Sequence, residues 1–170
     1  MTVMTGLSIE DFNVLDEPEA EAALLACCSS PEWARRVLDG RPYADAEELF
    51  VAANVALSLL SDEQLAAALA GHPRIGERPE GGRSAAWSRQ EQSGVDEADA
   101  DLRRELREGN RAYEERFGHV YLVCATGKNG EEMLELLHRR LRNSPEEEQA
   151  VLREELRRIN RLRLERLLSA

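Results

Sequence analysis

The C-terminal stretch of the chain, residues 143–170, reads NSPEEEQAVLREELRRINRLRLERLLSA. Ser144 stands directly before Pro145, an arrangement that favours a helix start because proline fits the first helical position. The acidic residues 146–148 suit the positive end of the helix dipole. This stretch therefore predicts one long helix that continues to the end of the sequence.

An arginine interrupts the apolar stripe of this helix. At 100° per residue, Leu152, Leu156 and Ile159 fall within about 60° of one another. Arg163 lies about 20° from Leu152 in the same projection, whereas Arg161 points the other way. A buried guanidinium costs several kcal/mol unless it is paired. Two interpretations of Arg163 follow. In the first, its side chain extends past the helix end to solvent or forms a structural ion pair. In the second, it is a fixed cation that binds an anionic ligand.

Helix-capping residues recur along most of the chain. Ser30 precedes Pro31, Asp45 precedes an apolar run, and Asn129 precedes another; each side chain can accept a hydrogen bond at a helix start. Helices with short joins between them pack as a bundle. The helices predicted ahead of the last one cover residues 16–28, 30–40, 45–60, 61–71, 84–93, 96–117 and 129–141.

One compact apolar stretch departs from this pattern. Residues 120–125, VYLVCA, lie between Gly118 and Gly127 and are rich in residues that favour extended backbone. A single segment of this kind is too isolated to make a sheet. The predicted fold class is all-α, a single-domain bundle over residues 1–170 with about seven to nine helices and one short extended segment near residues 120–125.

Composition restricts the functional classes. Hydrophobic residues make up 42% and charged residues 32% of the 170 positions, which is typical of a globular protein with a real core. The formal net charge of −11 argues against nucleic-acid binding, which depends on clustered Lys and Arg. No apolar run approaches the roughly 20 residues of a membrane helix, and the first ten residues lack signal-peptide features. We expect a cytoplasmic protein with neither nucleic-acid nor membrane partners.

Metal and disulfide signals are missing from the sequence. Cys27, Cys28 and Cys124 are an odd number of cysteines without CxxC spacing, so neither disulfides nor structural zinc are expected. There is no HxxxH, HExxH or Cys/His cluster, and no Walker loop, GxGxxG or GxSxG motif. The sequence therefore predicts no metal site.

Two stretches carry candidate functional side chains. Residues 71–83, GHPRIGERPEGGR, form a long connection that is either a mobile surface loop or a functional one. His72 opens it before a proline that restricts the backbone, and is either an ordinary loop histidine or a catalytic one. Further along, Ser88, Glu91 and Gln92 share one helix face. That face is either solvated, or brackets a small polar ligand.

Five motifs follow one another along the chain: HPRIG at 72–76, SRQEQ at 88–92, YEERFG at 113–118, VCA at 123–125, and Ile159 followed by LRL at 162–164. Taken in series, they resemble the family of 2-oxo-4-hydroxy-4-carboxy-5-ureidoimidazoline (OHCU) decarboxylases, which act between urate and allantoin. The resemblance extends over essentially the whole chain and implies an all-helical fold, no cofactor, a small ureidoimidazoline substrate and a homodimer.

The resemblance also implies site residues. It makes His72 the general acid/base, since imidazole titrates nearest neutral pH. Glu91 would hydrogen-bond the substrate and help to set the charge state of His72, and Arg163 would hold an anionic oxygen. The residues implied to line the substrate site, the last five largely through backbone groups, are Pro73, Ser88, Arg89, Gln90, Gln92, Tyr121, Leu122, Val123, Cys124 and Ala125.

The chain departs from the family pattern in two places. His119-Val120-Tyr121 stands where many members carry Phe-Pro-Phe, and the sequence ends Leu168-Ser169-Ala170 rather than in a peroxisomal tripeptide, so a bacterial-type cytoplasmic enzyme is expected. An alternative is a catalytically inactive helical protein-binding module on the same scaffold. The enzyme hypothesis predicts that His72, Glu91 and Arg163 converge on one cavity, whereas an Arg163 side chain in bulk solvent would favour the module.

Overall fold

The structure is a computed structural model that describes residues 6–70, 72, 74, 87, 89–91 and 100–168. In these residues the backbone forms eight helices joined by short irregular segments, which confirms the all-α prediction. The chain divides into two compact units. Unit 1 comprises Met1–Ala68 and Arg157–Ala170, and unit 2 comprises Leu69–Leu156. That residues 1–170 act as one domain stays a prediction.

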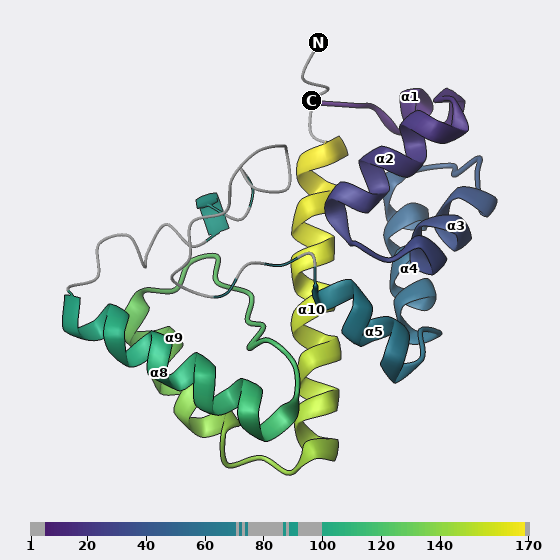
Figure 1. The fold of residues 1–170 in the computed structure, drawn as a ribbon. Coiled ribbons are helices and arrows are strands. Elements are labelled where there is room, and N and C mark those ends of the chain that lie inside the picture. Colours follow the sequence, from purple (N-terminus) through teal and green to yellow (C-terminus); the bar gives the residue numbers. More distant parts are fainter. Residues whose placement is uncertain are drawn as a thin grey trace. The chain divides into compact units, whose positions relative to one another are not determined.

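The helices of unit 1 begin at capping residues, as the sequence predicts. The Ser30 side chain accepts a hydrogen bond from the Trp33 backbone, and Asp45 accepts one from Glu48. The structure adds α1, a helix that is not among those predicted, which opens with a Ser8 capping box. Unit 1 contains α1 (Ile9–Val14), α2 (Glu17–Cys27), α3 (Pro31–Asp39), α4 (Ala46–Ser58), α5 (Asp62–Leu69) up to Ala68, and the second half of α10 (Pro145–Leu168) (Figure 1).

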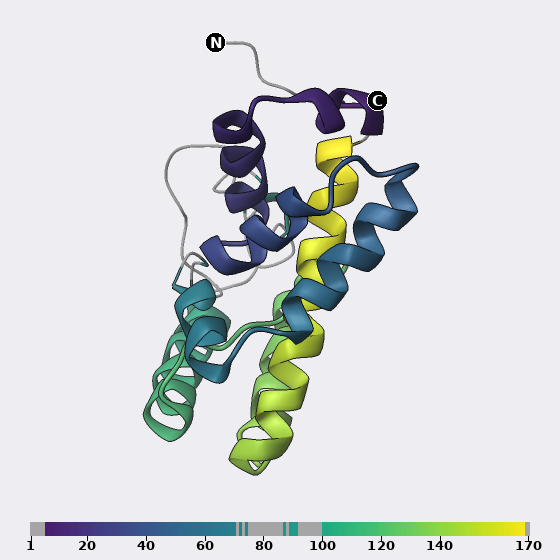
Figure 2. The ribbon, with the colours of Figure 1, turned by 90° about the vertical axis from the view of Figure 1, so that its right-hand side faces the viewer.

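A buried tryptophan and an arginine connect the helices of unit 1. Trp33 on α3 is fully buried, and its indole Nε1 donates to the Ala53 carbonyl of α4 at 3.0 Å. Figure 2 shows α4 running beside the second half of α10. There Arg161 stacks on the Phe50 ring at 4.1 Å and pairs with Glu47 at 3.4 Å. Arg161 therefore lies on the face of α10 toward α4.

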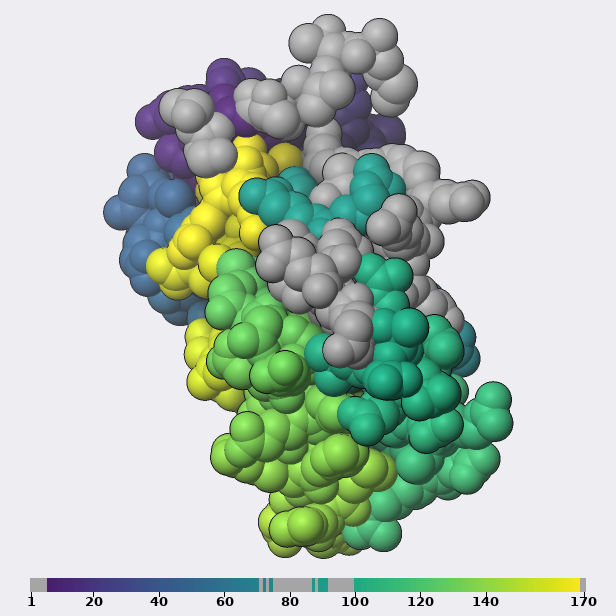
Figure 3. All heavy atoms as spheres, turned by 90° about the vertical axis from the view of Figure 1, so that its left-hand side faces the viewer, coloured from purple at the N-terminus to yellow at the C-terminus, as the bar shows by residue number. Residues whose placement is uncertain are grey.

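Unit 2 is built on two long helices, α8 (Ala100–Phe117) and α9 (Gly130–Arg140), together with the first half of α10. The atoms of α8 and α9 lie against one another on the face shown in Figure 3. Gly109 permits this approach, because a Cβ there would collide with the Leu137 side chain. Gly118 ends α8 with a φ of 79°, a left-handed conformation that favours glycine.

The segment between α8 and α9 is the extended one that the sequence predicts. Residues 120–125 are neither helical nor paired as a strand with any described residue. Tyr121, Val123 and Ala125 enter the same buried cluster as Leu106 and Met133. This alternation is the period of two of extended backbone, so the segment is held by packing rather than by a sheet.

No single helix in the described residues is both long and apolar enough to cross a membrane. The consecutive helices α4 and α5 together reach the length and apolar composition of a membrane span, but the chain bends by 114° between them. Buried core helices of ordinary proteins reach the same length and composition, and both helices carry buried apolar residues such as Leu49 and Leu65.

Candidate active site

His72 lies just after α5, in unit 2. Its backbone N–H donates to the Leu69 carbonyl at 3.0 Å. The residue is 9% exposed, so the imidazole is largely out of water although it belongs to a predicted loop. Two residues on, Arg74 forms a two-bond ion pair with Glu114 of α8, at 2.6 Å for Nε to Oε1 and 3.3 Å for Nη2 to Oε2. This pair fixes the chain next to His72 against α8.

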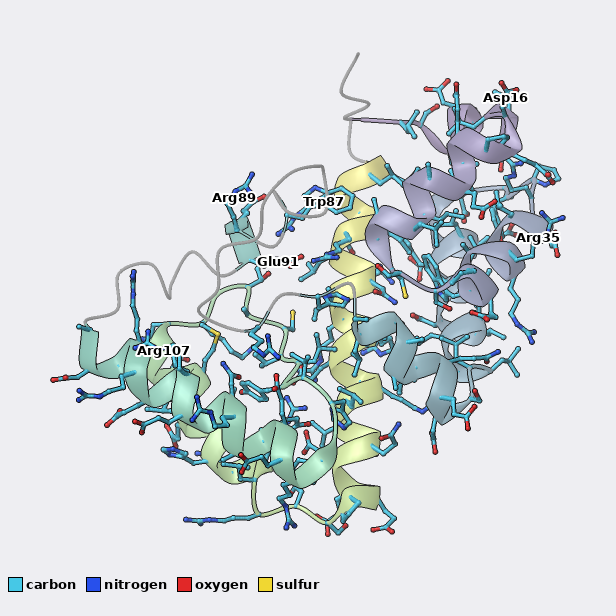
Figure 4. The ribbon with its side chains drawn as sticks, viewed as in Figure 1. Asp16, Arg35, Trp87, Arg89, Glu91 and Arg107 are labelled. Carbon is cyan, nitrogen blue, oxygen red and sulfur yellow. The ribbon has the colours of Figure 1, made fainter. Side chains whose placement is uncertain are left out.

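Glu91 is a buried carboxylate on a short helical piece. It is 7% exposed, whereas Arg89 and Gln90 are exposed. Figure 4 shows Arg89 and Glu91 projecting from opposite sides of this piece, as residues two apart on a helix do. A carboxylate is rarely buried unless it has partners. The solvated-face interpretation therefore does not hold for Glu91.

The charge of Glu91 acts on one of the predicted backbone-binding residues. Burial raises the pKa of the Cys124 thiol, Lys128 opposes the rise, and the negative charges of Glu155 and, to a smaller extent, Glu91 add to it. Within unit 2, Glu91 therefore influences a thiol that stands 33 positions away in the sequence. Pro73, Ser88 and Gln92 lie outside the described residues, so their predicted roles stay predictions.

Side chains of unit 2 hold the backbone of residues 121–125. The Cys124 N–H donates to Glu155 Oε2 at 3.0 Å, and the Cys124 carbonyl accepts from Lys128 Nζ at 2.7 Å. Arg140 donates to the Leu122 carbonyl, and the Tyr121 hydroxyl donates to the Met133 carbonyl at 3.1 Å. Three backbone groups of this segment, the Cys124 N–H and the carbonyls of Leu122 and Cys124, are thus bonded to side chains of unit 2, and the single Cys124 N–H is not available to a substrate.

A buried ion pair lies behind this segment. Arg140 and Glu148 are both buried and pair directly, with Nε to Oε1 at 2.6 Å. The Tyr113 hydroxyl donates to Glu148 at 2.5 Å, and Asn143 donates to its second oxygen at 3.1 Å. Desolvation raises the pKa of Tyr113, so the phenol stays a neutral donor to the carboxylate. Because Arg140 also binds the Leu122 carbonyl, the pair orients the segment that carries predicted site residues.

Arg163 belongs to unit 1 and is 2% exposed. Its burial agrees with its predicted position in the apolar stripe of α10, and its Nη1 donates to the Cys27 carbonyl at 3.5 Å. Arg161, predicted to point the other way, is partly exposed and pairs with Glu165 at 2.7 Å. Since His72 and Glu91 belong to unit 2, the convergence of the three predicted catalytic residues stays a prediction.

All three cysteines are free and buried. Among the described residues, no group of three or more His, Cys, Asp or Glu side chains is arranged to hold a metal ion. Burial raises the pKa of the Cys28 thiol from 9.0 to about 11, and Asn160, Arg163 and the Ser30 backbone oppose the rise. At neutral pH this thiol is protonated, which makes it a poor nucleophile.

The Cys28 thiol predicts how stability changes at alkaline pH. Its folded-state pKa is raised, so its contribution is complete below about pH 9 and is lost as the pH rises through 11. We expect the free energy of unfolding to fall by about 2 kcal/mol more in the wild type than in Cys28→Ala between pH 8 and pH 11. Urea unfolding at several pH values measures the difference. Parallel curves for the two proteins would contradict the assignment.

Comparison with known proteins identifies the family and the relatives that this chain resembles. The family model described as OHCU decarboxylase matches residues 13–165. The 2-oxo-4-hydroxy-4-carboxy-5-ureidoimidazoline decarboxylase of Amia calva is 32% identical over 168 residues, covering 97% of this chain and 92% of that protein. The uric acid degradation bifunctional protein TTL of Arabidopsis thaliana is 29% identical over 147 residues. That match covers 84% of this chain but 45% of the plant protein, so the chain spans less than half of its length.

Solved structures agree with these matches. A crystal structure of an OHCU decarboxylase in the presence of (S)-allantoin superposes with a TM-score of 0.77 at 26% identity, covering 92% of this chain and 100% of that one. A crystal structure of (S)-allantoin synthase gives a TM-score of 0.72 at 16% identity, covering 93% and 53%; at that identity the likeness concerns the fold. With the family model matched across 13–165, this chain belongs to the OHCU decarboxylase family.

Proposed function

We propose that this chain is a carboxy-lyase that converts 2-oxo-4-hydroxy-4-carboxy-5-ureidoimidazoline to (S)-allantoin and CO₂ in urate degradation, without a cofactor. The observation that carries the proposal is the burial of two charged side chains, Glu91 at 7% and Arg163 at 2% exposed, in a chain of this family. Buried charges are costly to a fold. They are therefore good candidates for groups that serve a ligand.

The reaction requires the protein to orient the substrate and to stabilise the charge that develops on it, and little else. The bond between ring carbon C4 and its carboxylate breaks, CO₂ leaves, and the electron pair forms a C4=C5 double bond while the ring imine nitrogen takes up the charge. The C4 hydroxyl then loses its proton and becomes the carbonyl, and a proton adds from one face to C5, the carbon that bears the ureido group, and gives the S product. Because the ring accepts the electron pair, the protein must supply a fixed geometry, electrostatic stabilisation and a proton.

Three side chains supply these functions in the proposal. His72 moves the proton, Glu91 hydrogen-bonds the substrate and helps to set the charge of the imidazole, and Arg163 holds an anionic oxygen. The burial of all three supports the proposal, since a drier environment strengthens each charge interaction. A binding role for residues 121–125 would fall to backbone groups other than the Cys124 N–H, which donates to Glu155.

The optical activity of the product is the test of this function. The uncatalysed reaction also yields allantoin, but as a racemate, because the proton adds to either face. Urate is oxidised in the presence of hydroxyisourate hydrolase, with and without this chain, and circular dichroism follows the product. We expect the S enantiomer to accumulate when the chain is present. A racemic product formed at the uncatalysed rate would contradict the proposed activity.

A conservative change at Arg163 tests its role. Arg163→Lys keeps the charge but loses the planar pair of donors, and we expect kcat/KM to fall at least about tenfold. Arg161→Lys is the matched control on the same helix, because Arg161 pairs with Glu47 and Glu165 and has no proposed part in the reaction. Equal losses in both variants would exclude a bidentate role for Arg163.

The alternative of an inactive binding module loses support from burial. That alternative requires Ser88, Glu91 and Gln92 to form an exposed face and the Arg163 side chain to lie in solvent. Glu91 and Arg163 are both buried. A homodimer and a cytoplasmic location complete the proposed function. Val51 and Val55, exposed one turn apart on α4, supply an apolar surface for self-association.

A further inference from the structure

A buried amide in unit 1 has only a weak partner, a thiol, among the described residues. Asn160 lies on α10 and is 3% exposed. Neither its Nδ2 nor its Oδ1 has a partner at ordinary hydrogen-bond geometry in the part of the chain that the structure describes, and the group that it reaches is the Cys28 thiol, a weak partner. Nearly all buried polar side chains in folded proteins are hydrogen-bonded, so an exception calls for a functional explanation.

The surroundings of Asn160 point to a ligand with a negative charge. Asn160 and Arg163 are three residues apart, so their side chains share one face of α10. Both act on the Cys28 thiol at the end of α2, where Asn160 and Arg163 each oppose the burial-driven rise in pKa. The Arg163 guanidinium donates to the neighbouring Cys27 carbonyl at 3.5 Å. A buried amide and a buried cation thus form one cluster, the Asn160–Arg163 cluster.

The two side chains offer complementary chemistry. A guanidinium only donates, whereas a primary amide both donates and accepts. A ureido group, NH–CO–NH₂, also does both, so an amide can meet it with two antiparallel hydrogen bonds. The proposed substrate carries its carboxylate and its ureido group on adjacent ring carbons. One helical turn, about 5–6 Å between side-chain origins, is a suitable spacing for reading both substituents.

We propose that Asn160 determines specificity by binding the ureido group of the substrate beside the oxygen that Arg163 holds. This inference rests on the proposed function, because the ureidoimidazoline substrate comes from it. The cost of burying an amide whose protein partner is only the weak Cys28 thiol is then offset by the substrate itself. A site built to hydrogen-bond a substrate group discriminates strongly against analogues that lack the group.

Binding of two related ligands tests the role of Asn160. (S)-Allantoin carries both the ring and the ureido group, whereas hydantoin is the same ring without it. We expect the wild type to prefer (S)-allantoin, and Asn160→Leu to lose about tenfold to a hundredfold of its affinity for (S)-allantoin while its affinity for hydantoin is unchanged. Isothermal titration calorimetry gives both affinities. Asn160→Leu should also melt at or above the wild-type temperature, because it removes a buried amide that only a weak thiol partner satisfies.

Two further variants keep the test decisive. Cys28→Ala disturbs packing in the same cluster but keeps the amide, so it should retain the wild-type preference for (S)-allantoin. Asn160→Asp keeps the side-chain volume and removes the two donors, and replaces Asn160→Leu if the latter does not fold. An unchanged preference in the Asn160 variants, or no preference in the wild type, overturns the inference. The proposed function fails separately, if the wild type yields racemic allantoin.

Discussion

Replacing His72 with alanine is expected to lower the rate of (S)-allantoin formation by about 10²- to 10⁴-fold, the usual contribution of a general acid/base. The allantoin that still forms should be nearly racemic, because proton delivery from one face is lost. The sequence alone suggests a loop histidine with little packing, but His72 is 9% exposed, so its removal also loosens its surroundings. His72→Gln, which keeps most of the volume, should therefore lose as much activity with less loss of stability.

The control for this prediction is another histidine. His138 lies exposed in the last turn of α9, and His138→Ala should leave both the rate and the optical purity unchanged. Stopped-flow absorbance gives the rate, and circular dichroism of the product gives the stereochemistry. Turnover near the wild-type rate in both His72 variants, with optically pure product, would remove His72 from the reaction.

Replacing Glu148 with alanine is expected to have the largest effect on stability. The change leaves the buried Arg140 guanidinium without its carboxylate, and breaking a buried ion pair from one side costs about 3–5 kcal/mol. It also removes the acceptor for Tyr113 and Asn143. Since whole domains are stable by about 5–15 kcal/mol, the variant should be close to unfolding at physiological temperature. Equilibrium urea unfolding at pH 7 measures the loss.

Two further variants isolate the role of burial in this effect. Glu135 forms an ion pair with Arg139 on the surface of α9, with both side chains more than half exposed; Glu135→Ala should cost about 0.5 kcal/mol or less. The double variant Arg140→Met with Glu148→Leu should recover most of the stability, because an apolar pair needs no partner charge. A loss below about 1 kcal/mol in Glu148→Ala would show that Arg140 is not held by this carboxylate.

The helices could be predicted because their signals are local. Ser30 with Pro31, Asp45 and Asn129 each mark a helix start that the structure confirms within a residue or two. The helix α1 was not predicted because it has six residues, too few for an apolar period to show. The capping box formed by Ser8 and Asp11 was a usable signal for this helix start, although no apolar period accompanies it.

The polar interior could not be predicted from spacing. Glu148 belongs to an acidic triplet that reads as a favourable helix start, yet it is fully buried against Arg140, eight residues away, and Tyr113, 35 residues away. Periodicity reports which face of a helix is apolar, but not which charge on another element meets it. Asn160 was missed for the same reason, since an asparagine beside an apolar stripe has no distinctive pattern.

By itself, the sequence determined the helical class of this protein, the extended residues 120–125 and the place of Arg163 in the apolar stripe of the last helix, because helix caps and residue periods act within a few positions of the chain. The tertiary structure alone decided that the charge of Glu91 acts on Cys124, that Arg140 and Glu148 orient the backbone at Leu122, and that the Asn160 amide has only the weak Cys28 thiol as its partner. These outcomes depend on which distant side chains share a dry environment, where each polar group must find a partner or remain costly.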